Sequence, residues 1–246
     1  MNSPLPLAIE IEINSDCNMS CAYCPNSNSE RVESGHMSED LFLKILRELN
    51  VAEYRGRISY HFYNEPTLSP NLVKFVKLTR EYLPEAFIDL FSNGTLLDNN
   101  KIEELIAAGV DKFTLTKHIG ANIAAVEAAM ETMAEHILKK IRLTGYKQIQ
   151  LTNRGGLVKV KSQHHRAPLS LPCFIPRCAL VITLQGNIVP CYEDYLQKNS
   201  MGNIQNHSII EIWNSKKYVA FRERLKTGQR STIDVCKSCN NAWIIS

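Results

Sequence analysis

The sequence has 246 residues, of which 44% are hydrophobic and 22% charged, a length that fits one α/β barrel or a domain with a small appendage. Lys and Arg exceed Asp and Glu by 28 − 25 = 3 and form no long basic run, so charge gives no reason to expect nucleic acid or an anionic membrane as partner. Residues 1–16 carry acidic side chains within their apolar stretch, unlike a signal peptide, and no apolar run approaches the roughly 20 residues of a membrane helix. We therefore expect a cytoplasmic protein.

Predicted strands and helices alternate along the first two thirds of the chain. Helical patterns run over 37–49, 68–83, 97–109 and 121–142, with Ser38 and Asp98 as N-caps and Gly109 as a stop. Apolar or alternating runs predict five strands, at 7–13, 58–63, 86–94, 111–118 and 147–156. This alternation favours a parallel sheet or an open barrel.

Polar clusters follow the ends of the predicted strands. They are a three-cysteine loop, then Asn64-Glu65-Pro66, Ser92 to Thr95, Thr116 to His118, and Thr152 to Gly156. In parallel α/β folds the ligand site lies at the carboxyl ends of the strands. We therefore expect these five clusters to converge on one rim and to form a site there.

Eight cysteines form two groups along the chain. In a reducing compartment, cysteines in such numbers indicate metal binding or catalysis more than disulfides. Two metal sites are the economical interpretation, and three thiolates on one loop could in principle hold zinc. The first group is Cys17, Cys21 and Cys24, and the second is Cys173, Cys178, Cys191, Cys236 and Cys239.

The first group has the spacing C-x3-C-x2-C with an aromatic residue, Tyr23, before its last cysteine. This motif resembles that of the radical S-adenosylmethionine (SAM) enzymes. The resemblance implies that three cysteines bind three irons of a 4Fe–4S cluster, and that the fourth iron is left for the amino and carboxylate groups of SAM. Electron transfer into the sulfonium requires it to lie against the cluster, where a fourth cysteine would block it.

The resemblance also gives the other rim residues expected roles. Asn64-Glu65-Pro66 takes the place of the family's Gly-Gly-Glu-Pro, whose Glu receives the methionine amino group. Ser92 and Asn93 stand where the family contacts the ribose hydroxyls. Tyr23, Asn64 and Thr116 complete the expected cofactor-binding set.

The last third of the chain predicts a small appendage. A loop-like stretch at 164–172 suggests two domains, 1–163 and 164–246. Within the second domain, the sequence predicts a hairpin at 179–191 that turns at Gly186-Asn187, followed by a helix within 207–228. The metal ligands expected here are Cys173, Cys191, Cys236 and Cys239. Four cysteines satisfy a structural zinc well, whereas the Gly-x4-Cys pattern ending at Cys191 resembles the cluster-binding appendage called Twitch, related to SPASM. That resemblance implies a second, auxiliary 4Fe–4S cluster, with Cys178 left as an alternative to Cys173 or as a small core residue.

Similarity to radical SAM enzymes that oxidise a secondary alcohol of an aminocyclitol extends over most of the chain. It implies a partial (β/α)6 TIM-type barrel, hydrogen abstraction by a 5′-deoxyadenosyl radical, and an auxiliary cluster that accepts an electron as the ketone forms. Matching positions place Arg154 and Tyr63 near substrate and Tyr192 beside the auxiliary cluster, and His118 is a further candidate. Asn64 and Lys117 replace Gly and Gln, and both are expected to face the pocket.

Two other functions remain open from the sequence. In one, the enzyme is a maturase of a ribosomally made peptide, in natural-product (RiPP) biosynthesis, that crosslinks, epimerises or excises residues with a separate peptide-recognition protein. In the other, the chain is a cluster-bearing electron carrier or sensor, which would leave the rim motifs unused. The expected partners are a small-molecule or peptide substrate and a reducing flavodoxin or ferredoxin.

Overall fold

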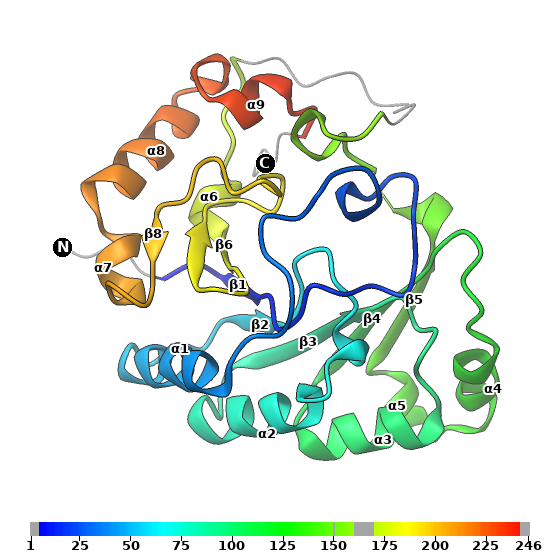
Figure 1. Ribbon diagram of the computed structural model, residues 1–246. Helices are drawn as coiled ribbons and strands as arrows, with labels where there is room; N and C mark the ends of the chain where they lie inside the picture. The colour runs from blue at the N-terminus through cyan, green and yellow to red at the C-terminus, as the bar shows by residue number, and fades with distance from the viewer. Residues whose placement is uncertain (1–4, 150, 160–169, 242–246) are drawn as a thin grey trace.

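The structure, a computed structural model, describes residues 5–149, 151–159 and 170–241 (Figure 1). Its described strands form one sheet in the order β5-β4-β3-β2-β1-β6-β7-β8. Strands β1 to β6 pair with one another in parallel, and β7 and β8 are added antiparallel beyond β6. The strands are β1 (Ala8–Ile11), β2 (Arg57–Ser59), β3 (Phe87–Ser92), β4 (Lys112–Lys117), β5 (Ile141–Gly145), β6 (Ala179–Ile182), β7 (Asn187–Val189) and β8 (Gly202–Asn203).

Helices connect the parallel strands and cover one face of the sheet (Figure 1). The predicted caps are confirmed, since Ser38 accepts from the N–H of Leu41 at 3.3 Å and Asp98 from that of Lys101 at 2.8 Å. The helices are α1 (Glu39–Val51), α2 (Leu72–Tyr82), α3 (Asn99–Ala108), α4 (Ala124–Thr132), α5 (Glu135–Leu138), α6 (Ile175–Cys178), α7 (Ile209–Trp213), α8 (Lys216–Lys226) and α9 (Asp234–Ser238). Short 3-10 turns are Pro25–Ser27, Pro66–Leu68, Tyr146–Gln148, Arg154–Gly156 and Arg230–Thr232. None of the helices among the described residues is long and apolar enough to cross a membrane.

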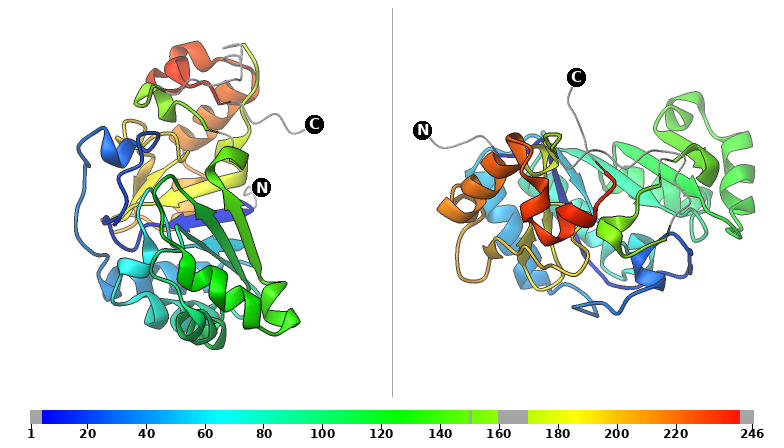
Figure 2. Two further views of the ribbon diagram at one scale, coloured as in Figure 1. Left: turned by 90° about the vertical axis from the view of Figure 1, so that its right-hand side faces the viewer. Right: turned by 90° about the horizontal axis from the view of Figure 1, so that it is seen from above.

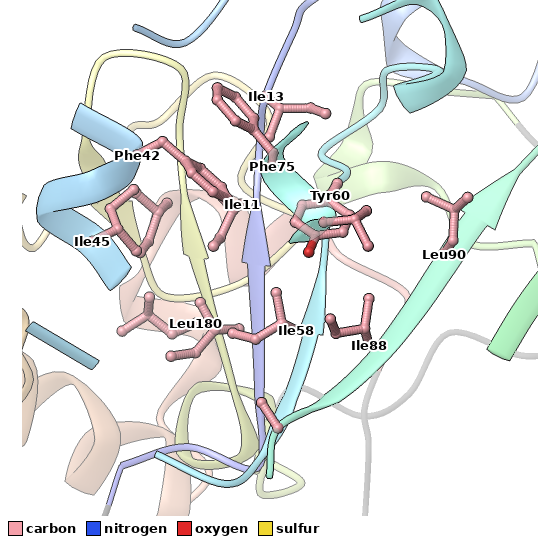
Figure 3. Close-up of a cluster of buried hydrophobic side chains, with 14 of the residues drawn as sticks. Ile11, Ile13, Phe42, Ile45, Ile58, Tyr60, Phe75, Ile88, Leu90 and Leu180 are labelled. Carbon is pink, nitrogen blue, oxygen red and sulfur yellow. The ribbon is translucent and has the colours of Figure 1, made fainter. Parts of the chain in front are cut away.

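The main core lies between the sheet and its covering helices. Alternation along β1 directs Ile9 and Ile11, both fully buried, toward the helices. There Phe42 of α1 and Phe75 of α2 stack with ring centroids 4.0 Å apart (Figure 3). The same alternation leaves Glu10 on the opposite, inner face of the barrel, so the inner face is polar and available for a site.

Two predicted elements near residue 140 are wrong. The helix expected over 121–142 ends at Thr132, because Met133 and Ala134 take extended backbone, and it resumes only as the short α5. The fifth strand is Ile141–Gly145, paired with β4, and not 147–156, where the described residues form 3-10 turns. The alanine-rich part is helical in α4, but helix propensity is a weak signal, and the residues from Ile141 onward pair their backbone groups with the edge of β4 instead.

The appendage is joined directly to the barrel sheet. Its hairpin forms as predicted, but β6 lies parallel to β1, with Ile182 opposite Ile11. The single helix expected within 207–228 is instead α7 and α8, because Ser215 caps a new helix. Figures 1 and 2 show these helices beside β6–β8, away from α2–α5. The predicted boundary between 163 and 164 lies outside the described residues.

The parallel-dominated sheet with helices on one face confirms the predicted α/β class, a partial TIM-type barrel with a C-terminal appendage. Its strand ends place the rim loops together, on the side where the appendage stands (Figure 1).

Candidate active site

The three cysteines of the first group border one cavity. Cys17, Cys21 and Cys24 are free thiols in the loop after β1, and the N–H of Cys24 donates to the carbonyl of Cys21 at 2.9 Å, which folds the loop back. Burial raises the pKa of all three thiols, to about 11 for Cys24. Such thiols stay protonated unless a cation holds them as thiolates, the form that binds the irons of a cluster. The donor set therefore fits an iron–sulfur cluster.

Buried polar side chains hold the cysteine loop against the barrel and against the appendage. Arg31 forms an ion pair with Glu12 of the inner barrel face and donates to the carbonyl of Phe62 at 3.3 Å. Glu33, further along the loop, accepts from Thr183 at 3.1 Å and from the N–H of Gln185 at 2.9 Å, in the turn of the appendage hairpin. The loop that carries the cysteines is thus fixed to both the barrel and the appendage.

Glu65 organises the rim beside the cysteine loop. Its carboxylate is buried and accepts from the hydroxyl of Ser92 at 2.8 Å and from the N–H of Asn93 at 2.7 Å. Burial raises the pKa of Glu65, and these donors oppose the rise. The Asn93 side chain in turn donates to Asn18 in the cysteine loop at 2.8 Å. Three segments that are far apart in sequence are therefore held in one hydrogen-bonded unit.

His118 at the end of β4 lies against Tyr23. Their side chains share a hydrogen bond of 2.8 Å between Tyr Oη and His Nδ1, and Tyr23 stacks on Tyr146 with ring centroids 6.4 Å apart. Burial, followed by the charge of Arg154, lowers the pKa of His118. The imidazole is therefore neutral at pH 7 and forms a wall of the cavity.

Arg154 reaches the same cavity from the turn that replaced the predicted fifth strand. Its guanidinium lies 3.8 Å from the carboxylate of Glu193 and 5.4 Å from the ring centroid of Tyr63. Burial alone would lower the pKa of Arg154, but Tyr63 and Glu193 outweigh it and raise the pKa. Its buried Nε has no hydrogen-bond partner in the described part of the chain. Arg154 is thus a permanent cation with a donor left for a ligand.

Backbone strain accompanies this arrangement. Tyr63 and Arg154 have φ angles of 65° and 50°, a region that side chains other than glycine seldom adopt. The strained Tyr63, which stands where the family has glycine, donates its hydroxyl to the carbonyl of Tyr192 at 2.7 Å. Strain of this kind concentrates at functional sites, where surrounding structure maintains it. Here it ties the barrel rim to the segment that carries Cys191.

One cavity of about 420 Å³ collects the predicted residues. All those expected to hold the first cluster, the cofactor or the substrate line it. They are Cys17, Cys21, Tyr23, Cys24, Tyr63, Asn64, Glu65, Ser92, Asn93, Thr116, His118, Arg154 and Tyr192. The convergence expected from the strand ends is therefore present, while the individual roles stay predictions.

The cavity continues to a polar floor inside the barrel, which the sequence reasoning missed. Glu10 forms an ion pair with Arg57 at 2.5 Å and lies 3.1 Å from Nδ1 of His61, which stacks on Phe91. Burial lowers the pKa of His61. The alternation of glutamate and isoleucine after position 8 could have predicted this polar floor, because in a barrel the polar face of such a strand points inward.

Glu193 was also missed. Its buried carboxylate accepts from the hydroxyl of Thr152 at 2.8 Å, from the N–H of Gly155 at 3.1 Å and from the side chain of Asn241 at 3.1 Å, besides facing Arg154. Its position two residues after Cys191 was the only signal in the sequence. Glu193 thus links the Arg154 turn to the cysteine segments of the appendage.

Lys117 does not face the cavity, contrary to the prediction. Alternation along β4 points Thr116 and His118 inward and Lys117 outward, where it pairs with Glu127 of α4 at 2.6 Å. Asn64 does line the cavity, but its side chain is occupied by Asn14 at 2.8 Å and by the N–H of Phe62 at 2.6 Å. Of the two substitutions, only Asn64 can affect the pocket directly.

A second, mainly apolar cavity in the appendage is lined by Cys173, Cys191, Cys236 and Cys239. Burial raises the pKa of Cys236 and Cys239 to about 12. The N–H of Glu193 lies 3.4 Å from Sγ of Cys191, and that of Asn241 lies 3.2 Å from Sγ of Cys239. Four cysteines around one cavity, two of which receive backbone N–H groups, fit an iron–sulfur cluster, whose sulfurs accept such bonds.

Cys178 and the spacing of the possible metal ligands limit how the cysteines can be used. Cys178, at the end of α6, does not line the appendage cavity, so Cys173 remains the better ligand. Within the described ranges, no three His, Cys, Asp or Glu side chains approach closely enough to hold a single metal ion. The fit to clusters therefore rests on the donors and their surroundings.

Two family models match the chain in consecutive segments. One, described as the radical SAM superfamily, matches residues 11–150, and the other, the SPASM iron–sulfur cluster-binding domain, matches residues 173–240. The second match agrees with the auxiliary-cluster interpretation of the appendage cysteines and replaces the zinc alternative.

Similar proteins agree with the family models. A SAM-dependent 2-deoxy-scyllo-inosamine dehydrogenase from Niallia circulans is 40% identical over 236 residues, 96% of this chain and 93% of that protein. The crystal structure of BtrN in complex with AdoMet and 2-DOIA has a TM-score of 0.91 at 38% identity, covering 97% of this chain and 94% of that one. A PqqA peptide cyclase from Gluconobacter oxydans is 29% identical over 112 residues, which are 45% of this chain and 30% of that protein.

Proposed function

The chain belongs to the radical SAM superfamily, and we propose that it oxidises a secondary alcohol of an aminocyclitol to a ketone. One observation carries the proposal. A single cavity is lined by the three-cysteine loop, Arg154 and Tyr192. Tyr192 directly follows Cys191, a cysteine of the second group, in the chain. Hydrogen abstraction and electron removal can therefore occur at one substrate. The similarity of nearly the whole chain to a dehydrogenase supports this choice of reaction.

When bound, the first cluster and SAM supply a 5′-deoxyadenosyl radical, formed with one electron from an external reductant. Oxidation of the alcohol removes a hydrogen atom from carbon, a proton from the hydroxyl and one electron. The hydrogen atom would end in 5′-deoxyadenosine and the proton would leave to solvent, while Cys173, Cys191, Cys236 and Cys239 would hold the cluster that takes up the electron. Overall, SAM and the alcohol give methionine, 5′-deoxyadenosine, the ketone and a proton, so atoms and electrons balance.

Arg154 is the residue that we assign to the reacting oxygen. Its cationic fork donates hydrogen bonds, and Nε is unpartnered in the described residues. Glu193 and the ring of Tyr63 fix the guanidinium, which makes both of them positioning residues. Because the pKa of Arg154 is raised, it orients the oxygen and does not take its proton.

The cavity floor suits the amino group of an aminocyclitol. Glu10 is buried, and its Oε1 is occupied by Arg57. Its Oε2 faces His61, which is neutral because burial lowers its pKa. A carboxylate that lines the cavity and has one buried oxygen without a hydrogen-bond partner in the described residues attracts a substrate ammonium. We assign Glu10 to that contact.

The proposal is tested by anaerobic turnover with dithionite, SAM and 2-deoxy-scyllo-inosamine deuterated at its oxidisable carbon. We expect deuterium in 5′-deoxyadenosine and an equal amount of ketone, both measured by mass spectrometry. Arg154→Gln should lower ketone formation at least a hundredfold, while Lys117→Gln, which changes an outward-facing side chain, should match the parent. Unlabelled 5′-deoxyadenosine without ketone would contradict the aminocyclitol and direct the search to peptide substrates, which the partial matches to peptide cyclases favour.

Further parts of the proposal concern partners and location. A one-electron reductant of the flavodoxin or ferredoxin type would supply the first electron. Clusters held by free thiols need reducing surroundings, so we propose the cytoplasm. We also keep the division into a barrel, 1–163, and an appendage, 164–246, as a proposal.

A further inference from the structure

Arg230 is a fully buried arginine in the wall of the appendage cavity. It is 1% exposed and lines the cavity together with the four cysteines. Its Nη2 donates to the carbonyls of Cys239 at 3.1 Å and Asn241 at 2.6 Å. Its Nη1 is buried and has no hydrogen-bond partner among the described residues. Arginine is rarely buried unless it is paired, so this charge requires a counterpart.

The neighbouring carboxylates do not supply that counterpart. Asp194, which also lines the cavity, accepts from the N–H groups of Lys198 at 2.9 Å and Asn199 at 2.7 Å. Glu193 is occupied by the hydrogen bonds described above and faces Arg154. In the ranges that the structure describes, no ion pair to Arg230 is formed.

The guanidinium lies beside the cysteines themselves. Its Nη2 contacts the backbone of Cys239, and its side chain lines the same cavity as all four cysteines. A cluster held by those cysteines would therefore lie next to this charge. Reduction adds one negative charge to a cluster that four thiolates already make negative, and a nearby cation favours the more negative state.

We propose that Arg230 is the counter-charge of the auxiliary cluster and raises its reduction potential. The observation behind it is the placement of an unpartnered guanidinium nitrogen in the wall of the four-cysteine cavity. With the charge present, the cluster accepts an electron more readily. That the electron comes from the substrate rests on the proposed function, but the effect of Arg230 on the potential does not.

The chain offers a matched control in Arg222 of α8. This arginine is also buried, and its Nη1 is likewise without a hydrogen-bond partner in the described residues. Its charge lies over the ring of Trp213, 4.0 Å from the centroid, and it does not line the cysteine cavity. Arg222→Gln therefore removes a buried charge of the same appendage without removing one from the cavity wall.

The experiment uses full-length protein with Cys17, Cys21 and Cys24 replaced by Ala, so that reconstitution loads only the appendage. Redox titration followed by electron paramagnetic resonance gives the potential of that cluster directly, with iron content as a check on loading. Arg230→Gln, Arg230→Met, Arg230→Lys and Arg222→Gln are compared in this background. The readout needs neither SAM nor substrate, so a failure of the proposed function is distinguishable from a failure here.

We expect both neutral variants at Arg230 to lower the ratio of reduced to oxidised cluster at least tenfold at a fixed applied potential, equal to 59 mV for a one-electron couple. Arg230→Lys, which keeps the charge, and Arg222→Gln should stay within threefold of the parent. An unchanged ratio in the neutral variants, or an equal fall in Arg222→Gln, would overturn the proposal. So would failure of both neutral variants to bind iron, since Arg230 would then serve only to clamp the carbonyls of the C-terminal loop.

Discussion

Arg31 offers a sharp test of how the cysteine loop is held. Arg31→Gln removes the partner of Glu12, whose side chain is 1% exposed, while the Arg31 side chain is 15% exposed. The mutation also removes the hydrogen bond to Asn26 at 2.7 Å, within the loop itself. Glu12 keeps the bond from the N–H of Leu184 at 3.0 Å but is left as a buried charge without a cation.

The expected magnitude follows from that burial. Breaking a buried ion pair by removing one partner costs roughly 3–5 kcal/mol, because the remaining charge is uncompensated. At an m-value of about 3 kcal/mol/M, this lowers the urea midpoint by roughly 1 to 1.7 M. A surface pair provides the control. Lys74 and Glu39 lie 2.5 Å apart but are 53% and 44% exposed, so Lys74→Gln should cost less than about 1 kcal/mol.

The assay is anaerobic urea denaturation of the reconstituted protein followed by circular dichroism, with iron measured on the same samples. Arg31→Gln should also lose iron from the first cluster and keep that of the appendage. The double variant Glu12→Gln/Arg31→Gln should recover part of the loss, since it buries no unpaired charge. If Arg31→Gln and Lys74→Gln shift the midpoint equally, the loop does not depend on this buried pair.

Three more predictions concern the cysteines and the cavity floor. Replacing Cys17, Cys21 and Cys24 by Ala should remove about half of the iron and all SAM cleavage. An iron assay and chromatography of 5′-deoxyadenosine measure the two losses. Zinc in the remaining site would contradict the electron-acceptor role of the appendage. Cys178→Ala should leave the iron content and the cluster spectrum unchanged, because this thiol lies outside the appendage cavity, and loss of iron there would make it a ligand. Burial lowers the pKa of His61 below its ordinary 6.5, so the unfolded chain binds the proton first as pH falls. The free energy of unfolding should therefore decrease as pH falls through 6.5 toward the folded-state value, and less so in His61→Gln.

The tie between the two cysteine groups has a mechanistic consequence. Tyr63 donates to Tyr192, and Glu193 faces Arg154 while its N–H meets the sulfur of Cys191. The groups that would hold the substrate oxygen are therefore within a few bonds of an auxiliary ligand. In the proposed reaction, an electron released at that oxygen would have a short path to a cluster held by the appendage cysteines.

Local sequence determined the chemistry of the site. The spacing of Cys17, Cys21 and Cys24 and the terminal C-x2-C pair predicted two cysteine sites because such ligand spacings are short-range. The polar clusters at strand ends predicted one rim because parallel strands all present their carboxyl ends to one side. Helix caps at Ser38 and Asp98 were readable for the same local reason.

Tertiary structure decided what depends on partners distant in the chain. The strand Ile141–Gly145 forms by pairing with the edge of β4, a partner that no local pattern shows, whereas the alanines before it stay helical in α4. Lys117 points outward and Glu10 inward because the sheet curves into a barrel, which gives each strand face its inside and outside. Arg230 shares a cavity with Cys173 and Cys191 only because the hairpin and the C-terminal segment meet in the folded appendage, and no short-range pattern shows that meeting.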